Sequence, residues 1–149
     1  IRRRKEGFLE AAGKAGAKVR TVAVPAGLTE EKSEAWLAAK LKRSRPDGIY
    51  TASSVTGLET LVAGKAAGLD IPESTSLVGS DAALWRSPGC PTITSVDASW
   101  YRAGELAVRT MFEARDRESA RFDNIALPPL IRAGGSCPVA ERFADLVGR

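Results

Sequence analysis

The chain has 149 residues, of which 44% are hydrophobic, and this length is enough for one ordinary globular core. Its net charge of +4 comes from 22 basic and 18 acidic residues. Only the stretches RRRKE and KLKRSR concentrate positive charge, so the pattern favours solvated helix faces over a nucleic-acid groove. The absence of histidine excludes catalytic triads, histidine-rich zinc sites and histidine general bases, and it favours a binding module over an enzyme.

Cysteine usage and hydropathy indicate a compartment. Cys90 and Cys137 lie far apart without the spacing of metal ligands, and we interpret them as reduced thiols of a cytoplasmic protein that needs no metal or other cofactor. No apolar stretch approaches the roughly 18 to 20 residues of a membrane span, and the N-terminal residues lack the apolar region of a secretion signal. The chain begins inside a helical pattern without an initiating Met, which we interpret as a fragment of something longer.

The first half of the chain shows two helix-to-strand units. Apolar residues recur at helical spacing from residue 3 to about residue 15, and KVRTVAV at residues 18–24 alternates as a strand does. Thr29 is a suitable N-cap for a helix that ends before Pro46, because two acids follow it in the first turn. A short buried strand is predicted over residues 49–52.

The second half repeats the pattern. Ser53 or Ser54 can cap a helix that ends at Gly68, and strands are predicted over residues 75–81 and 92–96. A further helix is predicted from residue 100 to about residue 114, then extended segments on either side of Pro128 and Pro129, and a terminal helix over residues 138–149. These alternating units predict an α/β fold with a doubly wound, mainly parallel sheet.

Ligands of such sheets bind outside the carboxyl ends of the strands, so the residues at those ends are the candidates for a site. Asp81 follows the strand SLVGS, where its carboxylate can accept two hydroxyl donors or can cap a short turn. Ser53 and Ser54 can bind a ligand or cap the helix that follows. Asp97 can contribute to the site or simply begin the turn into the next helix.

Four stretches, RRKEGF, GIYTASSVTGLETLVAGKAAGLDIPESTSLVGSDA, PTITSVDASWYRAGELA and LPPLIRAGGS, resemble the ligand-binding part of the LacI/GalR transcriptional regulators. They occur in the family's order and span nearly the whole chain. The resemblance implies a type I periplasmic-binding-protein-like fold, mostly its C-terminal subdomain, with most of the N-terminal subdomain and the DNA-binding helices missing.

The resemblance assigns roles residue by residue. Arg4 matches the arginine that usually binds effector oxygens, and Asp81 matches the acid that typically binds sugar hydroxyls. Ser53 and Ser54 stand where the family usually has Asn-Asp, so the expected ligand is not an ordinary hexose or is a larger molecule. Trp85, like Trp100, can stack on a sugar or belong to the core or a dimer surface. Ser80 replaces a usual aromatic residue, and Ala98 a usual polar one.

The same resemblance implies a mechanism and an organisation. Residues 1–97 would belong to the C-terminal subdomain, residues 98–128 would cross into the N-terminal one, and residues 129–149 would return. A sugar or related polyol would act as effector and change operator DNA binding by a domain absent from this chain. The regulator would be a homodimer that uses the helix of Leu58 and Leu61 and the loop of Cys90 and Pro91. The alternatives are a sugar-binding protein of a transport system and a small enzyme of doubly wound fold, the latter disfavoured by the absence of histidine and of a phosphate loop.

Overall fold

The computed structural model describes residues 2–82, 86–115 and 125–138. The elements in chain order are α1 (Arg2–Lys14), α2 (Glu30–Ser44), β1 (Gly48–Thr51), α3 (Ser54–Ala66), β2 (Ser76–Ser80), β3 (Thr94–Asp97), α4 (Trp100–Arg115) and β4 (Leu130–Arg132). The predicted α/β class is confirmed. The terminal helix predicted over residues 138–149 lies almost entirely outside the described residues.

The sheet has the order β1-β2-β3-β4. The strands β1, β2 and β3 are parallel, and β4 pairs with β3 in the antiparallel direction. The register places Thr51 beside Gly79, and Ser80 beside Val96. The three parallel strands therefore end at one edge of the sheet, where the candidate site residues were expected.

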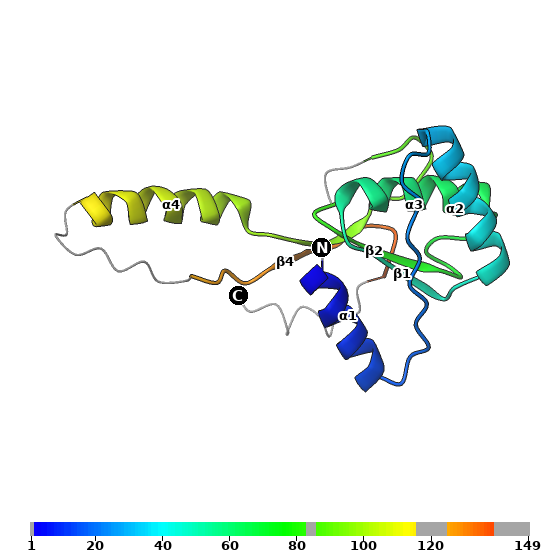
Figure 1. Ribbon diagram of the computed structural model, residues 1–149, viewed down its shortest axis with the longest axis horizontal. Helices are drawn as coiled ribbons and strands as arrows, with labels where there is room; N and C mark the ends of the chain where they lie inside the picture. The colour runs from blue at the N-terminus through cyan, green and yellow to red at the C-terminus, as the bar shows by residue number, and fades with distance from the viewer. Residues whose placement is uncertain (1, 83–85, 116–124, 139–149) are drawn as a thin grey trace.

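The helices α2 and α3 cover one face of the sheet (Figure 1). One apolar cluster lies mainly between α2 and α3 and consists of Leu37, Leu41, Ala63, Ala67 and Leu69. A second cluster joins α3 to β2 and β3 and consists of Leu61, Leu77, Ala82 and Ile93. Leu61 is only 1% exposed and belongs to this core, whereas self-association through the helix stays a prediction.

Local signals placed the helix ends of α2 and α3 correctly. Thr29 caps α2 by accepting a hydrogen bond from the Lys32 N–H, and Ser53 caps α3 in the same way from the Thr56 N–H. Gly68 has a φ of +70° and donates to the Lys65 carbonyl, while the next N–H bonds to the Gly64 carbonyl. These two bonds form a Schellman motif, which needs a left-handed residue at this position and therefore favours glycine.

The strand predicted over residues 18–24 is wrong, because these residues form no strand. Val19 and Val22 are 41% and 46% exposed, and the outer edge of β1 pairs with no strand among the described residues. Alternating hydrophobicity does not make a strand without a partner for its backbone N–H and C=O groups. Residues 20–22 instead lie against α2, where they help to line a cavity of about 270 Å³ together with Trp36 and Lys40.

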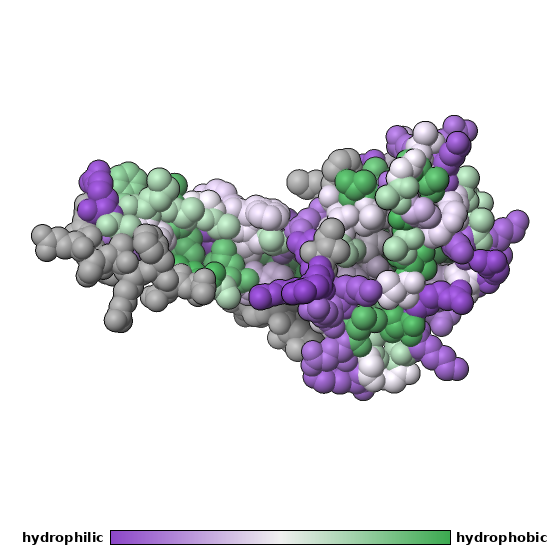
Figure 2. Space-filling view, viewed as in Figure 1, coloured by the Kyte–Doolittle hydropathy of each residue, from purple (hydrophilic) through white to green (hydrophobic). Residues whose placement is uncertain are grey.

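The helix α4 projects away from the α/β body (Figure 1). No residue of α4 is buried. Large apolar side chains are exposed along it, and Val108, Met111 and Phe112 contribute to the green patches over α4 in Figure 2. Trp100 and Tyr101 are also exposed, at 68% and 90%. None of the helices in the described part of the chain combines the length and apolar character that a membrane span requires.

The segment after β4 closes the amino ends of the strands. Ser136 is fully buried, and its hydroxyl donates to the Leu77 carbonyl at 2.6 Å while it accepts from the Thr94 N–H at 2.9 Å. A Cβ on Gly134 would lie 2.5 Å from the Thr92 carbonyl oxygen, so this close approach requires glycine. The stretch GGSCP therefore joins β2 to β3 and has a structural role here.

Candidate functional site

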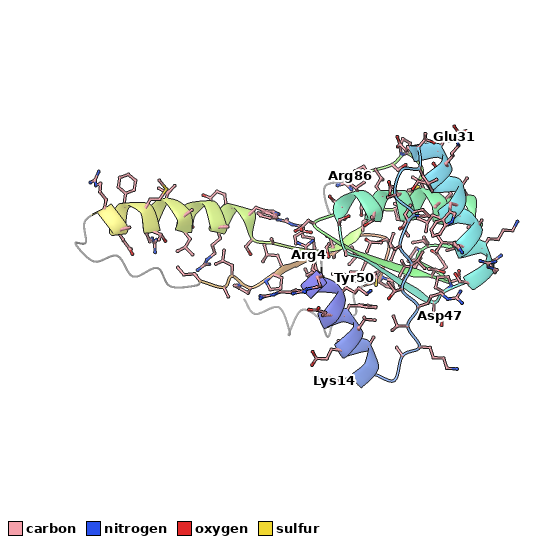
Figure 3. All side chains as sticks on the ribbon, viewed as in Figure 1. Arg4, Lys14, Glu31, Asp47, Tyr50 and Arg86 are labelled. Carbon is pink, nitrogen blue, oxygen red and sulfur yellow. The ribbon has the colours of Figure 1, made fainter. Side chains whose placement is uncertain are left out.

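Arg4 and Asp81 meet at the carboxyl ends of β1 and β2. The Arg4 Nη2 donates to the Asp81 Oδ2 at 2.5 Å, and the Arg4 Nη1 donates to the Ala52 carbonyl at 3.0 Å. Figure 3 shows Arg4 at the strand ends, whereas the labelled Asp47 lies at the other end of the sheet. The structure therefore brings together two predicted site residues that are 77 positions apart.

The backbone holds Asp81 in a fixed orientation. Its φ of +54° lies in the left-handed region, which aspartate adopts more readily than most residues. Its N–H donates to the Val96 carbonyl at 3.1 Å, and its Oδ1 accepts from the Ala98 N–H at 2.8 Å. The carboxylate is thus fixed between the ends of β2 and β3. Ala98, which has no polar side chain, contributes its backbone amide to the site.

The electrostatics of the site keep Asp81 ionised. Burial by itself raises the pKa of this carboxyl, because it removes water from the charged form. Several contributions outweigh burial and hold the pKa of Asp81 below its ordinary value. They are, in order, the hydrogen bond from the Ala98 N–H, the hydrogen bond and positive charge of Arg4, and a hydrogen bond from the Trp100 side chain. A carboxylate is therefore present throughout the neutral pH range.

The pair retains capacity for a ligand. The side chain of Arg4 is 39% exposed and that of Asp81 is 18% exposed, so both are accessible to solvent. A guanidinium has five N–H donors and a carboxylate has about four lone-pair positions, of which the internal bonds use only some. The remaining donors suit oxygen acceptors of a ligand, and the remaining lone pairs suit hydroxyl donors.

The other predicted site residues have different surroundings. The Ser53 hydroxyl accepts from the Thr56 N–H at 3.3 Å and lies 2.8 Å from the Thr56 hydroxyl, so it makes the cap that the sequence allowed. Ser54 begins α3 and is half-buried. Both serines follow Ala52, whose carbonyl binds Arg4, and their role in ligand binding stays a prediction. Trp85 lies outside the described residues.

Asp97, at the carboxyl end of β3, is engaged inside the protein. It is 7% exposed, it accepts a short hydrogen bond from the Ser95 hydroxyl, and it forms an ion pair with the Arg132 Nε on β4 at 2.9 Å. Its carboxylate therefore ties β4 to β3, and Asp97 also stands where the chain turns toward α4, as the sequence allowed. A role of Asp97 in ligand binding stays a prediction. Arg132 carried no sequence signal, because its partner lies on a strand far earlier in the chain.

Two aromatic residues are linked to the pair, and one of them, Tyr50, was not predicted as part of the site. The Trp100 side chain helps to lower the pKa of Asp81, and the sequence indicated that it could stack on a sugar or belong to the core or a dimer surface. Tyr50 lies on β1 with its hydroxyl 2.8 Å from the Ser80 hydroxyl. The described residues contain no group of three or more Cys, Asp or Glu side chains placed to hold a metal ion. The cavity against α2 shares no residue with the Arg4–Asp81 pair.

A family model of the periplasmic binding protein-like domain matches residues 1–137. The chain therefore belongs to the periplasmic binding protein-like domain family. The resemblance to LacI/GalR regulators is confirmed by solved structures of LacI-family regulators that share the fold. A comparison with curated proteins finds no match.

Three solved structures illustrate the similarity. The cellobiose complex of the transcriptional regulator CelR is 25% identical, with a TM-score of 0.68, and the match covers 89% of this chain and 41% of that one. The xylose-binding transcription activator xylR is 20% identical with a TM-score of 0.75, covering 90% and 37%. A LacI family transcriptional regulator from Arthrobacter sp. FB24 in complex with lactose is 17% identical with a TM-score of 0.70, covering 88% and 49%. The chain thus spans less than half the length of these three structures.

Proposed function

We propose that this chain is the effector-sensing region of a LacI/GalR-type transcriptional regulator and that it binds a sugar-like ligand through Arg4 and Asp81. The single observation that carries the proposal is the meeting of these two side chains at the carboxyl ends of parallel strands in a periplasmic binding protein-like domain. Three structural neighbours have lactose, sucrose or cellobiose bound, which supports a sugar as the ligand class.

The chemistry of the pair suits a polyhydroxylated ligand. An ionised carboxylate that is held by an amide and a guanidinium can accept two adjacent hydroxyl groups without having to reorient. Arg4 can donate to the ligand's oxygens with the N–H groups that its bonds to Ala52 and Asp81 leave unused. Because Ser53 and Ser54 provide only short hydroxyl side chains beside the pair, a disaccharide or larger ligand fills the space better than a hexose.

The arrangement of α4 supports the proposed division of the chain. Residues 1–97 form the C-terminal subdomain, residues 98–128 cross into an N-terminal subdomain, and residues 129–149 return. The exposed apolar side chains of α4 are suited to pack against that N-terminal subdomain, and β4 brings the chain back onto β3. In this proposal the ligand closes the two subdomains on each other and thereby changes operator binding by a separate DNA-binding domain in a homodimer.

A thermal-shift screen tests the proposed ligand class. Xylose, lactose, sucrose and cellobiose are added separately to the intact polypeptide that contains this chain, and to its Asp81→Asn variant. A ligand that binds only the folded state raises the melting temperature in a concentration-dependent way. We expect at least one sugar to stabilise the natural protein and none to stabilise Asp81→Asn. Stabilisation of both proteins by the same amount, or of neither by any sugar, contradicts the proposal.

A further inference from the structure

One side chain, Tyr50, contacts both of the elements that carry the Arg4–Asp81 pair. Its ring stacks on that of Phe8, which belongs to α1, with 4.8 Å between centroids and 12° between planes. Its hydroxyl lies 2.8 Å from the hydroxyl of Ser80, the last residue of β2. Phe8 follows Arg4 by four positions, and Ser80 immediately precedes Asp81. Tyr50 is therefore linked to Arg4 through one intermediate residue, Phe8, and to Asp81 through another, Ser80.

The link to Arg4 depends on how α1 is held. No residue of α1 is buried. Ile49 packs on α2 and α3, so its neighbour Tyr50 points to the opposite face of the sheet. Because Tyr50 stacks on Phe8, α1 lies on that opposite face. Residues four apart share one face of a helix, so the face that carries Arg4 also carries Phe8. Among the described residues, the ring and polar contacts that tie α1 to the sheet are the stack of Phe8 on Tyr50 and the two hydrogen bonds of Arg4.

The link to Asp81 depends on how the end of β2 is held. Ser80 is 2% exposed, so its hydroxyl is shielded from water and depends on Tyr50 as a partner. The next residue, Asp81, has a φ of +54°, so the chain turns directly after Ser80 and the position of Ser80 sets where this turn begins.

We propose that Tyr50 is a positioning residue that fixes Arg4 and Asp81 relative to each other. Through Phe8 it sets the position of α1 and of Arg4, and through Ser80 it sets the end of β2 and the orientation of Asp81. The use of this geometry for binding an effector rests on the proposed function, but the geometry itself does not. Tyr50→Phe keeps the stacked ring and removes only the hydroxyl, so it separates the two links.

The test is a carbon-detected NMR titration of the Asp81 carboxyl in the 149-residue chain. Tyr50→Phe and Phe8→Leu are compared with the natural sequence, and Tyr101→Phe is the matched control, because Tyr101 is 90% exposed on α4. Both substitutions loosen the bond from Arg4, so we expect the pKa of Asp81 to rise toward that of an ordinary aspartate in each of them. Tyr101→Phe should leave it unchanged.

A second background distinguishes positioning from a general structural role. In Arg4→Gln the charge that Tyr50 helps to place is gone, so the additional Tyr50→Phe substitution should shift the Asp81 titration much less than it does in the natural sequence. An equal shift in both backgrounds, or a lowered melting temperature without any shift in the natural background, overturns the proposal. If Tyr50→Phe does not fold, Phe8→Leu is carried through the same comparison. No effector enters this experiment, so failure of sugar binding leaves its result interpretable.

Discussion

Arg4 on α1 and Asp81 after β2 form an ion pair with 2.5 Å between the Nη2 and Oδ2 atoms, across 77 positions of sequence. The pair lies at the carboxyl ends of parallel strands, which is where ligands bind in doubly wound sheets. Each partner also has a second bond inside the protein, from Arg4 to the Ala52 carbonyl and from the Ala98 N–H to Asp81. These bonds orient both groups before any ligand arrives, which reduces the ordering that binding requires.

The Asp81 carboxylate should make stability depend on pH in the acid range. Its pKa is lower in the folded chain than in the unfolded chain, so its contribution to stability is fully present above the unfolded pKa, near 3.8, and is lost as the pH falls through the folded value. Urea unfolding is measured from neutral pH to the acid range for the natural chain and for Asp81→Asn. We expect the difference between their unfolding free energies to shrink as the pH falls. Two curves that stay parallel over the whole range would show that Asp81 does not contribute in this way.

The buried hydroxyl of Ser136 should matter for stability. Ser136→Ala removes the partner of the Thr94 N–H and of the Leu77 carbonyl, both of which are buried. A buried polar group without a partner costs about 1 to 3 kcal/mol, so we expect a loss of that size in chemical denaturation. Ser44→Ala is the control, since Ser44 is exposed and should change stability by less than about 0.5 kcal/mol. Equal small effects would refute the structural role of this segment.

Gly79 and Gly48 should respond differently to the same added methyl group. A Cβ on Gly79 would lie 2.7 Å from the Ala82 Cβ and 3.1 Å from Ile93, inside the core next to the site. A Cβ on Gly48, at the start of β1, would meet only the Ser76 carbonyl oxygen at 3.9 Å. We expect Gly79→Ala to cost about 1 to 3 kcal/mol of unfolding free energy through overpacking, and Gly48→Ala to be near neutral. Similar values for both would argue against the packing described.

The helix α4 should be much less protected than α3 in the 149-residue chain. Amide hydrogen exchange depends on local stability, and α4 has no buried residue, whereas α3 has five. We expect fast exchange over residues 104–115 and slow exchange over residues 58–66. In a longer natural polypeptide that includes an N-terminal subdomain, α4 should become protected. Slow exchange of α4 in the short chain would contradict the proposal that α4 packs against a missing subdomain.

Features that depend on neighbouring residues could be predicted from the sequence. The caps at Thr29 and Ser53 and the left-handed turn at Gly68 each depend on residues within one helical turn. The prediction of a strand over residues 18–24 was wrong, because a strand depends on distant residues and not only on its neighbours in the sequence. A strand needs a partner elsewhere, and no local pattern shows whether the partner is present.

Part of the candidate site was predictable from the position of Asp81 after a strand, and the family resemblance supplied Arg4. The structure adds that these two residues bind each other. The contact of Tyr50 with Ser80 joins residues 30 positions apart and left no signal in the sequence. The pair of Asp97 with Arg132 was missed for the same reason, because an ion pair between strands is set by register.

The most direct test of the central claim is a calorimetric titration of the sugar selected by the thermal-shift screen. It is carried out on the intact polypeptide, on Asp81→Asn, and on Asp47→Asn, whose exposed carboxylate lies at the other end of β1. We predict that Asp81→Asn weakens binding at least tenfold, which corresponds to about 1.4 kcal/mol, and that Asp47→Asn binds as the natural protein does. Unchanged affinity in Asp81→Asn would contradict the assignment of this site.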